Sequence, residues 1–238
     1  MSTRFYPATG RGVSDHGWLS SKFSFSFADF YDPTLQEFGA LRVLNDDVIA
    51  PGAGFPAHPH RDMEIITIPI SGALKHSDSM GHEEVVSSGE VQVMSAGSGV
   101  MHAEFNASTE EPVSLFQIWI QTATRNVAPR YDQKRFDWQS APKNTLQLLV
   151  SNDGRDASLR IHQDAFLSIG VFDAEHAFTY SVHDPSHGVY LFIIEGSAQV
   201  QDQTLSSRDA IGVTDATEIV FEAKQANTQI LVIEVPLE

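Results

Sequence analysis

The 238-residue sequence contains no cysteine. Disulfides, thiolate nucleophiles, zinc fingers and iron–sulfur clusters are therefore excluded, and any metal must be held by nitrogen and oxygen atoms. Basic residues are also scarce, because 15 Lys and Arg stand against 31 Asp and Glu and give a formal net charge of −16. A surface this acidic repels phosphate backbones and anionic lipid headgroups, so we expect no direct binding to nucleic acid or membranes.

Long apolar runs are missing as well. No stretch approaches the roughly 18 apolar residues of a membrane-spanning helix, and residues 1–12 lack the apolar centre of a signal peptide. We therefore expect a cytoplasmic protein. Apolar residues still make up 42% of the chain, which suffices for a folded core.

Short runs of β-branched, aromatic and aliphatic residues recur between turns, and helical periodicity is hard to find. The predicted strands are 40–44, 64–70, 90–94, 115–120, 146–150, 190–194, 218–221 and 229–235. This pattern indicates an all-β sandwich or barrel. Pro69 interrupts the second run, which favours an edge position or a bulge there.

The chain also divides into two similar halves. Placing Gly72 on Gly196 superposes the apolar run 65–70 on 189–194, which is a faint internal repeat. Between the halves, residues 122–144 are polar and break the strand rhythm. We therefore predict domains at 1–121 and 145–238, joined by a connecting segment at 122–144.

Two short histidine-containing segments carry the candidate chemistry. Alternate side chains of a strand share one face, so His58 pairs with His60, and His102 pairs with Glu104. Brought together on neighbouring strands, they offer three imidazole nitrogens and one carboxylate oxygen to a divalent iron, manganese, nickel, copper or zinc ion. The alternative is that they are surface histidines beside turns.

These segments resemble the two cupin motifs. Gly52, His58-Pro59-His60 and Glu64 are similar to the first motif, and Gly89, Gly97, His102 and Asn106 are similar to the second. The departures from the general cupin pattern resemble the pirin family, as do His16-Gly17-Trp18 and the stretches 24–33, 41–47 and 58–64.

The pirin resemblance implies a bicupin, in which two packed jelly-roll β-barrels hold one metal in the N-terminal barrel. Its ligand pattern falls on His58, His60, His102 and Glu104, and iron is the metal most associated with the family. Glu64, a ligand in many other cupins, is then expected either to support the site without bonding the metal or to have a purely structural role.

The repeat predicts a second barrel without metal. Moved into the second half, the four ligand positions fall on Val182, Asp184, Phe221 and Ala223, which do not re-create the ligand pairs. His183 and His187 lie nearby, and we interpret them as loop residues. His76, His82 and His176 have turn-like polar neighbours.

The resemblance extends to quercetin 2,3-dioxygenases, which open the central ring of a flavonol with O2 and release carbon monoxide. Glu104 is then both a metal ligand and the candidate catalytic base. The predicted walls of the substrate pocket are Phe23, Phe25, Phe55, Met63 and Phe105. Ordinary barrel core is the alternative for each of these residues.

Two other functions remain open. The family resemblance also fits a redox-sensing, metal-binding interaction protein that co-regulates transcription or a metabolic enzyme through a protein partner. A structural bicupin with an idle or zinc-filled site is the third interpretation. A monomer is expected in each case.

Overall fold

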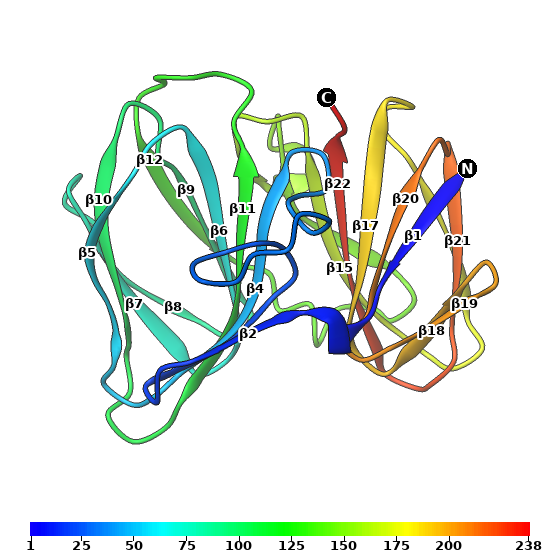
Figure 1. Ribbon diagram of the computed structural model, residues 1–238, viewed down its shortest axis with the longest axis horizontal. Coiled ribbons are helices and arrows are strands. Elements are labelled where there is room, and N and C mark those ends of the chain that lie inside the picture. The colour runs from blue at the N-terminus through cyan, green and yellow to red at the C-terminus, as the bar shows by residue number, and fades with distance from the viewer.

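Short apolar runs separated by turns fold into 22 strands, which the computed structural model of residues 1–238 arranges in four sheets (Figure 1). The only helices are two 3-10 turns, Ala8–Gly10 and Arg155–Ala157. Neither is long or apolar enough to cross a membrane. The sheets form two barrels that stand side by side, as expected for the predicted all-β bicupin.

The first barrel combines a seven-stranded and a four-stranded sheet. In spatial order, the larger sheet contains β12 (Arg130–Arg135), β9 (Glu90–Ser95), β6 (Met63–Ser71), β11 (Val113–Gln121), β4 (Leu41–Ile49), β3 (Leu19–Phe23) and β2 (Gly12–Asp15). The smaller sheet contains β5 (Gly54–His60), β10 (Val100–Asn106), β7 (Ala73–Asp78) and β8 (Glu83–Ser87).

The second barrel repeats this plan. Its larger sheet contains β1 (Ser2–Tyr6), β20 (Ala210–Thr214), β17 (His187–Glu195), β22 (Thr228–Pro236), β15 (Phe166–Phe172), β13 (Leu146–Ser151) and β14 (Leu159–Arg160). Its smaller sheet contains β16 (Ala177–Ser181), β21 (Glu218–Ala223), β18 (Ser197–Val200) and β19 (Gln203–Ser206). The faint sequence repeat therefore corresponds to two copies of one topology, with Gly72 following β6 and Gly196 following β17.

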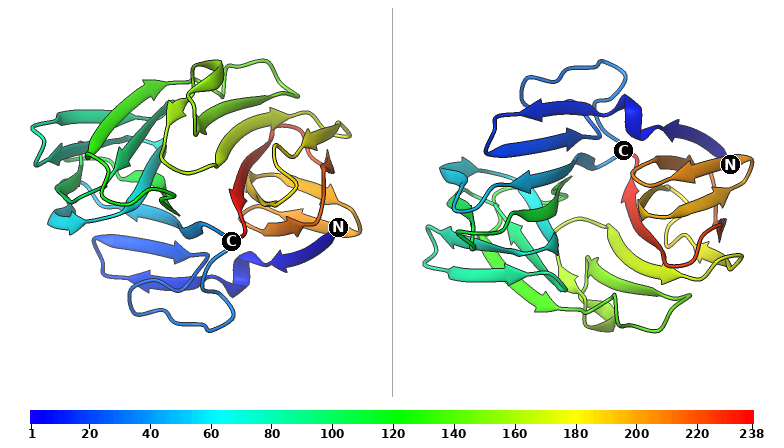
Figure 2. Two further views of the ribbon diagram at one scale, coloured as in Figure 1. Left: turned by 90° about the horizontal axis from the view of Figure 1, so that it is seen from above. Right: turned by 90° about the horizontal axis from the view of Figure 1, so that it is seen from below.

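Two strand pairings were not indicated by the sequence. β1 pairs with β20, so the first strand of the chain belongs to a sheet of the second barrel. Figure 2 shows this N-terminal segment, in blue, running along one side of both barrels. β12 lies within the predicted connecting segment 122–144 and pairs with β9, so that segment is not wholly irregular. The domain boundaries themselves stay a prediction.

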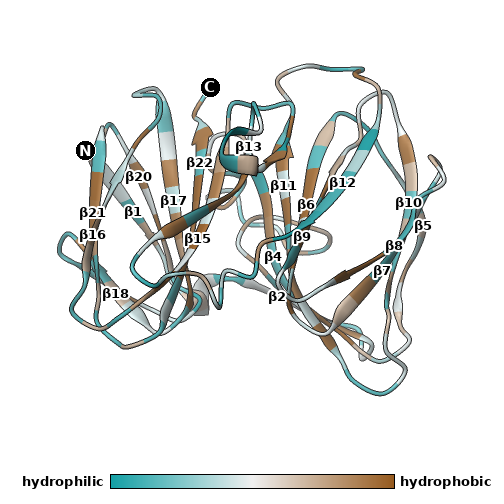
Figure 3. Ribbon diagram, turned by 180° about the vertical axis from the view of Figure 1, so that it is seen from behind, coloured by the Kyte–Doolittle hydropathy of each residue, from teal (hydrophilic) through white to brown (hydrophobic).

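The two large sheets pack against each other through a shared core. This cluster of 29 buried residues includes Leu44, Ile66 and Phe116 from the first barrel and Tyr190 and Ile233 from the second. Figure 3 shows β15 and β22, at the centre of the molecule, as largely hydrophobic strands. Burial of apolar surface between the sheets stabilises the pairing of the barrels.

The interiors of the two barrels differ. A cluster of 15 buried apolar residues, including Phe172, Phe221 and Ile230, fills the second barrel. The first barrel contains only clusters of five and four buried apolar residues, at its two ends. The space between those clusters contains the candidate site, and its lining combines aromatic and aliphatic residues with histidines and other polar residues.

All eight predicted strands are confirmed, with ends extended by up to five residues. The bulge expected at Pro69 is also confirmed, because the pairing of β6 with β11 slips between Ser71 and Pro69. β6 is a central strand between β9 and β11. The proline is therefore accommodated by a local irregularity and not by an edge position.

Candidate metal centre

Strands β5 and β10 bring the two predicted ligand pairs together. The strands run antiparallel, with His58 opposite His102, and the register shifts between His102 and Glu104. Gly54 permits their close approach, since a Cβ at that position would lie 2.2 Å from the Glu104 carbonyl oxygen. Along β10, His102 and Glu104 are buried whereas Met101 and Phe105 are exposed. Both candidate ligands of this strand therefore face the barrel interior.

Three imidazoles converge inside the barrel. Their ring centroids are 4.4 Å apart for His58 and His102, 4.8 Å for His60 and His102, and 4.9 Å for His58 and His60. One donor nitrogen from each ring lies within 4.8 Å of the others.

The donor atoms fit a first-row divalent ion. The Nε2 atoms of His58 and His102 are 3.0 Å apart, and two metal–nitrogen bonds of about 2.1 Å at right angles place their nitrogens about 3.0 Å apart. The buried Nε2 of His60 has no hydrogen-bond partner in the protein. A buried polar atom without a partner is costly, so a metal at this point would satisfy it.

Burial prepares the imidazoles for this role. It lowers the pKa of His60 to about 4, with a further contribution from His58. Burial, followed by the neighbouring His58 and His60, lowers the pKa of His102 as well. His60 and His102 are therefore neutral near pH 7, which is the form that binds metals.

Glu104 lies on the same wall but is held apart from the three-histidine cluster. Its Oε1 accepts a hydrogen bond from Gln92 at 2.9 Å, and its Oε2 accepts one from Gln117 at 2.9 Å. Burial raises the pKa of Glu104 to about 7, against the lowering effect of these hydrogen bonds. The Glu104 carboxylate instead forms a second cluster with His102 and His76, in which one possible ligand atom of each residue lies within 4.8 Å of the others. His102 is thus common to both groups.

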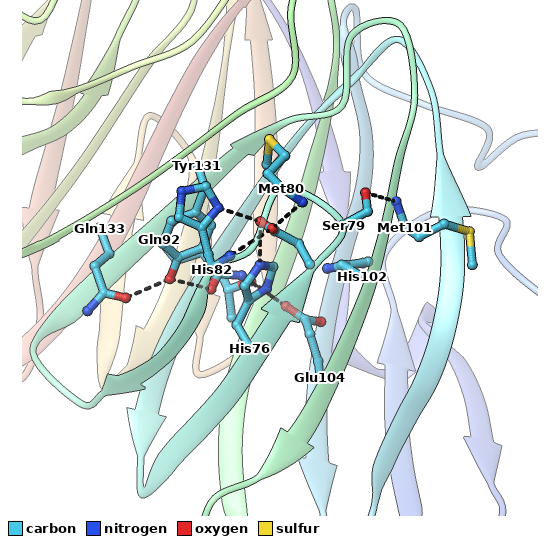
Figure 4. A network of polar contacts seen from close by, with 12 residues as sticks. His76, Ser79, Met80, His82, Gln92, Met101, His102, Glu104, Tyr131 and Gln133 are labelled. Carbon is cyan, nitrogen blue, oxygen red and sulfur yellow. Dashed lines mark hydrogen bonds and ion pairs between the residues drawn. The ribbon is translucent and has the colours of Figure 1, made fainter.

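His76 was not identified from the sequence. It is fully buried on β7, opposite Glu104, where a turn residue was expected. Its Nε2 lies 3.2 Å from Asp78, which also contacts His82 at 2.9 Å, and both rings stack on Tyr131 (Figure 4). The alternation His-x-Asp at residues 76–78 is the signal that indicates an inward-facing strand pair.

Tyr131 connects this network to the candidate base. Its hydroxyl donates to the Gln133 side-chain oxygen at 2.6 Å and lies 3.2 Å from that of Gln92, while the amide of Gln92 donates to Glu104 (Figure 4). Gln92 therefore lies between Tyr131 and Glu104. Tyr131 belongs to β12, so the segment after the first barrel's last long strand helps to position Glu104.

A cavity of about 310 Å³ opens onto the histidine cluster. It is lined by Phe27, Asn45, Asp47, Phe55, Pro56, Ala57, His58, His60, Ile65, His102, Glu104, Gln117 and Trp119. Three buried polar atoms of this lining, Asn45 Oδ1, Asp47 Oδ1 and Trp119 Nε1, have no hydrogen-bond partner in the protein. Burial raises the pKa of Asp47 to about 7.

The predicted pocket walls need correction. Of the five apolar residues expected there, only Phe55 lines the cavity. Phe23 packs behind Phe27, and Phe25 lies in the core between the barrels against Tyr6 and Tyr190.

Met63 and Phe105 also lie away from the cavity. Met63 packs beside a small apolar cluster at one end of the barrel. Phe105 faces outward, because it alternates with the inward-facing Glu104 on β10. The walls are instead Phe27, Ile65 and Trp119. Strand alternation places Ile65 and Trp119 on the inner face, and Phe27 comes from the loop after β3.

Of the two roles expected for Glu64, the structure fits the purely structural one and not support of the metal site. Glu64 precedes Ile65 on β6, and Ile65 faces the cavity, so Glu64 points through the opposite face of the sheet. There its fully buried Oε2 accepts a 2.6 Å hydrogen bond from Ser95. Glu64 is therefore close to His58 and His60 in the sequence but not on the face of the sheet that lines the site.

Two histidines of the second barrel surround a different carboxylate. His183 Nδ1 and His187 Nδ1 lie 2.8 and 2.9 Å from the buried Glu234, which also accepts a 2.6 Å hydrogen bond from Tyr180. His187 begins β17 and is buried, so it is not the loop residue that we expected. The positions corresponding to His102 and Glu104, Phe221 and Ala223, belong to the apolar filling of the barrel.

Comparison with known proteins relates both halves of the chain to one family. A family model described as Pirin matches residues 5–120, and one described as Quercetinase C-terminal cupin domain matches residues 148–235. An Escherichia coli K12 protein named quercetin 2,3-dioxygenase is 39% identical over 229 residues, which is 96% of each chain. A pirin-like protein of Caulobacter vibrioides is 41% identical over 93% of this chain and 94% of its own.

Solved structures agree with the sequence comparisons. The bacterial pirin YhhW of Escherichia coli in complex with nickel(II) superposes with a TM-score of 0.92 at 37% identity, over 99% of both chains. A quercetin 2,3-dioxygenase of Acinetobacter baumannii shares the fold, with a TM-score of 0.76 at 21% identity over 99% of this chain and 80% of its own.

Proposed function

The chain belongs to the pirin family, and from that premise we propose that it is a metal-dependent dioxygenase, which opens the central ring of a flavonol such as quercetin with O2. The observation that carries the proposal is the convergence of His58, His60 and His102 at a cavity in the first barrel. The name and near-full-length similarity of the Escherichia coli quercetin 2,3-dioxygenase support this choice of reaction.

We propose one divalent ion as the cofactor, held by His58, His60, His102 and Glu104. The three imidazoles already face one another, and Glu104 is next to His102 on the inner face of β10. The nickel(II) complex of the related YhhW supports a first-row divalent ion. Iron is our proposal for this chain, although three imidazoles and a carboxylate also accept manganese, nickel, copper or zinc.

The ion, when bound, makes a flavonol hydroxyl more acidic and supplies the chemistry for its reaction with O2. The released proton needs an acceptor on the cavity wall. Glu104 is one candidate base, although Gln92 and Gln117 already hydrogen-bond to its two oxygens. Asp47 faces the same cavity with an unpartnered Oδ1, so its carboxylate is free to take the proton.

The rest of the lining suits a flat, hydroxylated aromatic molecule. Phe27, Phe55 and Trp119 offer ring surfaces against which such a molecule packs, and they exclude water from the reacting carbon atoms. The unpartnered Asn45 Oδ1 and Trp119 Nε1 are an acceptor and a donor for hydroxyl and carbonyl groups. An apolar slot with a few polar atoms is typical of small-molecule sites.

Anaerobic loading with iron(II), and with nickel(II) in parallel, tests the proposal when followed by quercetin and oxygenated buffer. We expect loss of the flavonol absorption band together with formation of the ring-opened product and carbon monoxide. Protein with a fully occupied metal site and no ring-opened product would reject the proposed activity. His60→Ala, treated identically, is the control for oxidation of quercetin by free metal.

A further inference from the structure

A second cavity, of about 220 Å³, lies between the barrels and away from the candidate metal centre. Its lining comes from the start of the chain, from the loop after β3, and from β17 and the turn before β20. The first of these segments crosses from one barrel to the other, as Figure 1 shows for β1, the 3-10 turn Ala8–Gly10 and β2. Any molecule in this cavity therefore contacts both barrels.

Three of the chain's few basic residues line this cavity. Arg4, Arg11 and Arg208 all face it, although Lys and Arg number only 15 against 31 Asp and Glu in the whole chain. Arg4 comes from β1, Arg11 precedes β2, and Arg208 precedes β20. In so acidic a protein, three guanidinium groups at one cavity are not expected by chance.

Arg11 is the buried member of this group, with 6% of its side chain exposed. Its Nη2 donates to the Lys22 carbonyl at 2.8 Å, and its Nη1 reaches Asp46 at a long 3.4 Å. Its Nε is buried without a hydrogen-bond partner. A guanidinium in this position has a donor to spare and a desolvation cost that a bound anion would offset.

A hydroxyl beside Arg11 is also unpartnered. Ser24 lines the same cavity, is 4% exposed, and its Oγ has no hydrogen-bond partner. Two buried groups able to donate, Arg11 Nε and Ser24 Oγ, thus lie in the lining of one cavity. Both types of donor are common partners of oxyanions.

The acidic neighbours do not neutralise the site. Asp46 contacts Arg208 Nε at 2.7 Å and is shared with Arg11, and Glu195 contacts Arg208 at 3.3 Å from an exposed position. Asp32 lines the cavity, where its Oδ1 accepts hydrogen bonds from Thr34. Glu195 and Asp32 are screened by solvent, so the largely buried Asp46 is the one carboxylate that directly offsets the three guanidinium groups.

We propose that the cavity between the barrels binds a small oxyanion, either a phosphate group or a carboxylate, through Arg4, Arg11, Arg208 and Ser24. The anion accepts hydrogen bonds from Arg11 Nε and Ser24 Oγ, and the guanidinium groups of Arg4 and Arg208 offset its negative charge. Because the donors belong to both barrels, binding strengthens the contact between the barrels and raises the thermal stability of the whole protein.

Thermal unfolding of the metal-loaded protein tests the proposal, with inorganic phosphate and succinate titrated separately at constant ionic strength against chloride. We expect a saturable rise in Tm with at least one of the two anions. A response to phosphate alone assigns a phosphate ligand, and a response to succinate alone assigns a carboxylate ligand. A saturable response to both supports a general oxyanion site.

Two variants locate the effect without removing the buried Arg11. Arg4→Gln and Ser24→Ala should each weaken the apparent affinity at least tenfold. Arg125→Gln, which removes a charge outside the cavity, should leave it unchanged. The absence of a saturable rise with either anion, or equal affinity in wild type, Arg4→Gln and Ser24→Ala, would overturn the proposal.

Discussion

At the scale of single residues, burial decides the protonation of the candidate site. It lowers the pKa of His60 and His102, because a charged imidazole loses its hydration inside the barrel. It raises the pKa of Asp47 and Glu104 for the corresponding reason, because their charged form is the carboxylate. At pH 7 His60 and His102 of the metal-free site are therefore neutral, while Asp47 and Glu104 are each about half ionised.

Removal of a single imidazole should abolish metal retention. We expect His60→Ala and His102→Ala, loaded with iron(II) and dialysed, to retain less than a tenth of the wild-type metal, because each removes one of three converging donors. Elemental analysis of the dialysed protein measures this. His16→Ala is the matched control, since His16 is exposed and contacts only Ser14. Wild-type metal content in both site variants would refute the ligand assignment.

The buried Asp47 predicts a dependence of stability on pH. Its pKa is about 7 in the folded protein and near 3.8 in the unfolded chain, so the unfolded chain ionises first as the pH rises. The contribution of Asp47 to the stability of the metal-free protein should therefore fall between pH 4 and 7, while His60 and His102, whose pKa values are lowered, contribute in the opposite direction below pH 6.5. From pH 5 to 7 the loss from Asp47 is ~2 kcal/mol, because the slope of about 1.4 kcal/mol per pH unit falls to half at the pKa of the folded state.

Urea unfolding of the metal-free protein at pH 5, 6, 7 and 8 checks this dependence. The difference in unfolding free energy between wild type and Asp47→Asn should change by ~2 kcal/mol from pH 5 to 7, because the contributions of Glu104, His60 and His102 are common to both proteins. Identical slopes in wild type and Asp47→Asn would show that Asp47 ionises freely in the folded state.

At the scale of elements, the alternation of side chains on β10 and β6 decides which residues reach the site. The sequence placed His102 and Glu104 on one face of a strand, and the structure agrees. The same rule places Phe105 outside and Glu64 on the other face of β6, which nearness in sequence to the histidines does not reveal. Which face of a strand turns inward depends on partners far along the chain.

Other members of the site were beyond the sequence for the same reason. His76 approaches Glu104 because β7 pairs with β10, and Tyr131 reaches Gln92 because β12 pairs with β9. Such long-range pairing leaves no local pattern. Strands with strong apolar runs were predictable, whereas β5, with its two prolines, shows its strand character only through the histidine alternation.

Two phenylalanines test the inward and outward assignment. Phe55→Ala should raise the KM for quercetin severalfold, since Phe55 lines the cavity, whereas Phe105→Ala should leave the KM and kcat within twofold of wild type. Steady-state kinetics of the two metal-loaded variants measures the difference. An effect of Phe105→Ala as large as that of Phe55→Ala would mean that the substrate lies elsewhere.

At the scale of the whole molecule, one topology serves two purposes. The second barrel is filled by apolar residues such as Phe172 and Phe221, while the first leaves a cavity lined by both aromatic and polar side chains between two small clusters. The shared core joins them through their large sheets. A role of the protein in redox-dependent protein interaction and its expected monomeric state stay predictions.

The difference between the barrels predicts one metal ion per chain. In the second barrel, Phe221 and Ala223 occupy the positions that correspond to His102 and Glu104, and apolar side chains offer no ligand atoms. Elemental analysis of protein saturated with iron(II) and freed of excess metal should give a stoichiometry near one. A stoichiometry near two that falls to one in His183→Ala would place a second ion beside Glu234.

Anomalous diffraction from crystals of the metal-loaded protein, at the absorption edge of the metal, tests the central claim most directly. We predict a single strong peak within bonding distance of His58, His60 and His102, with a carboxylate oxygen of Glu104 completing the site. A peak elsewhere in the molecule, or none in the first barrel of protein shown to contain one equivalent of metal, would contradict the account.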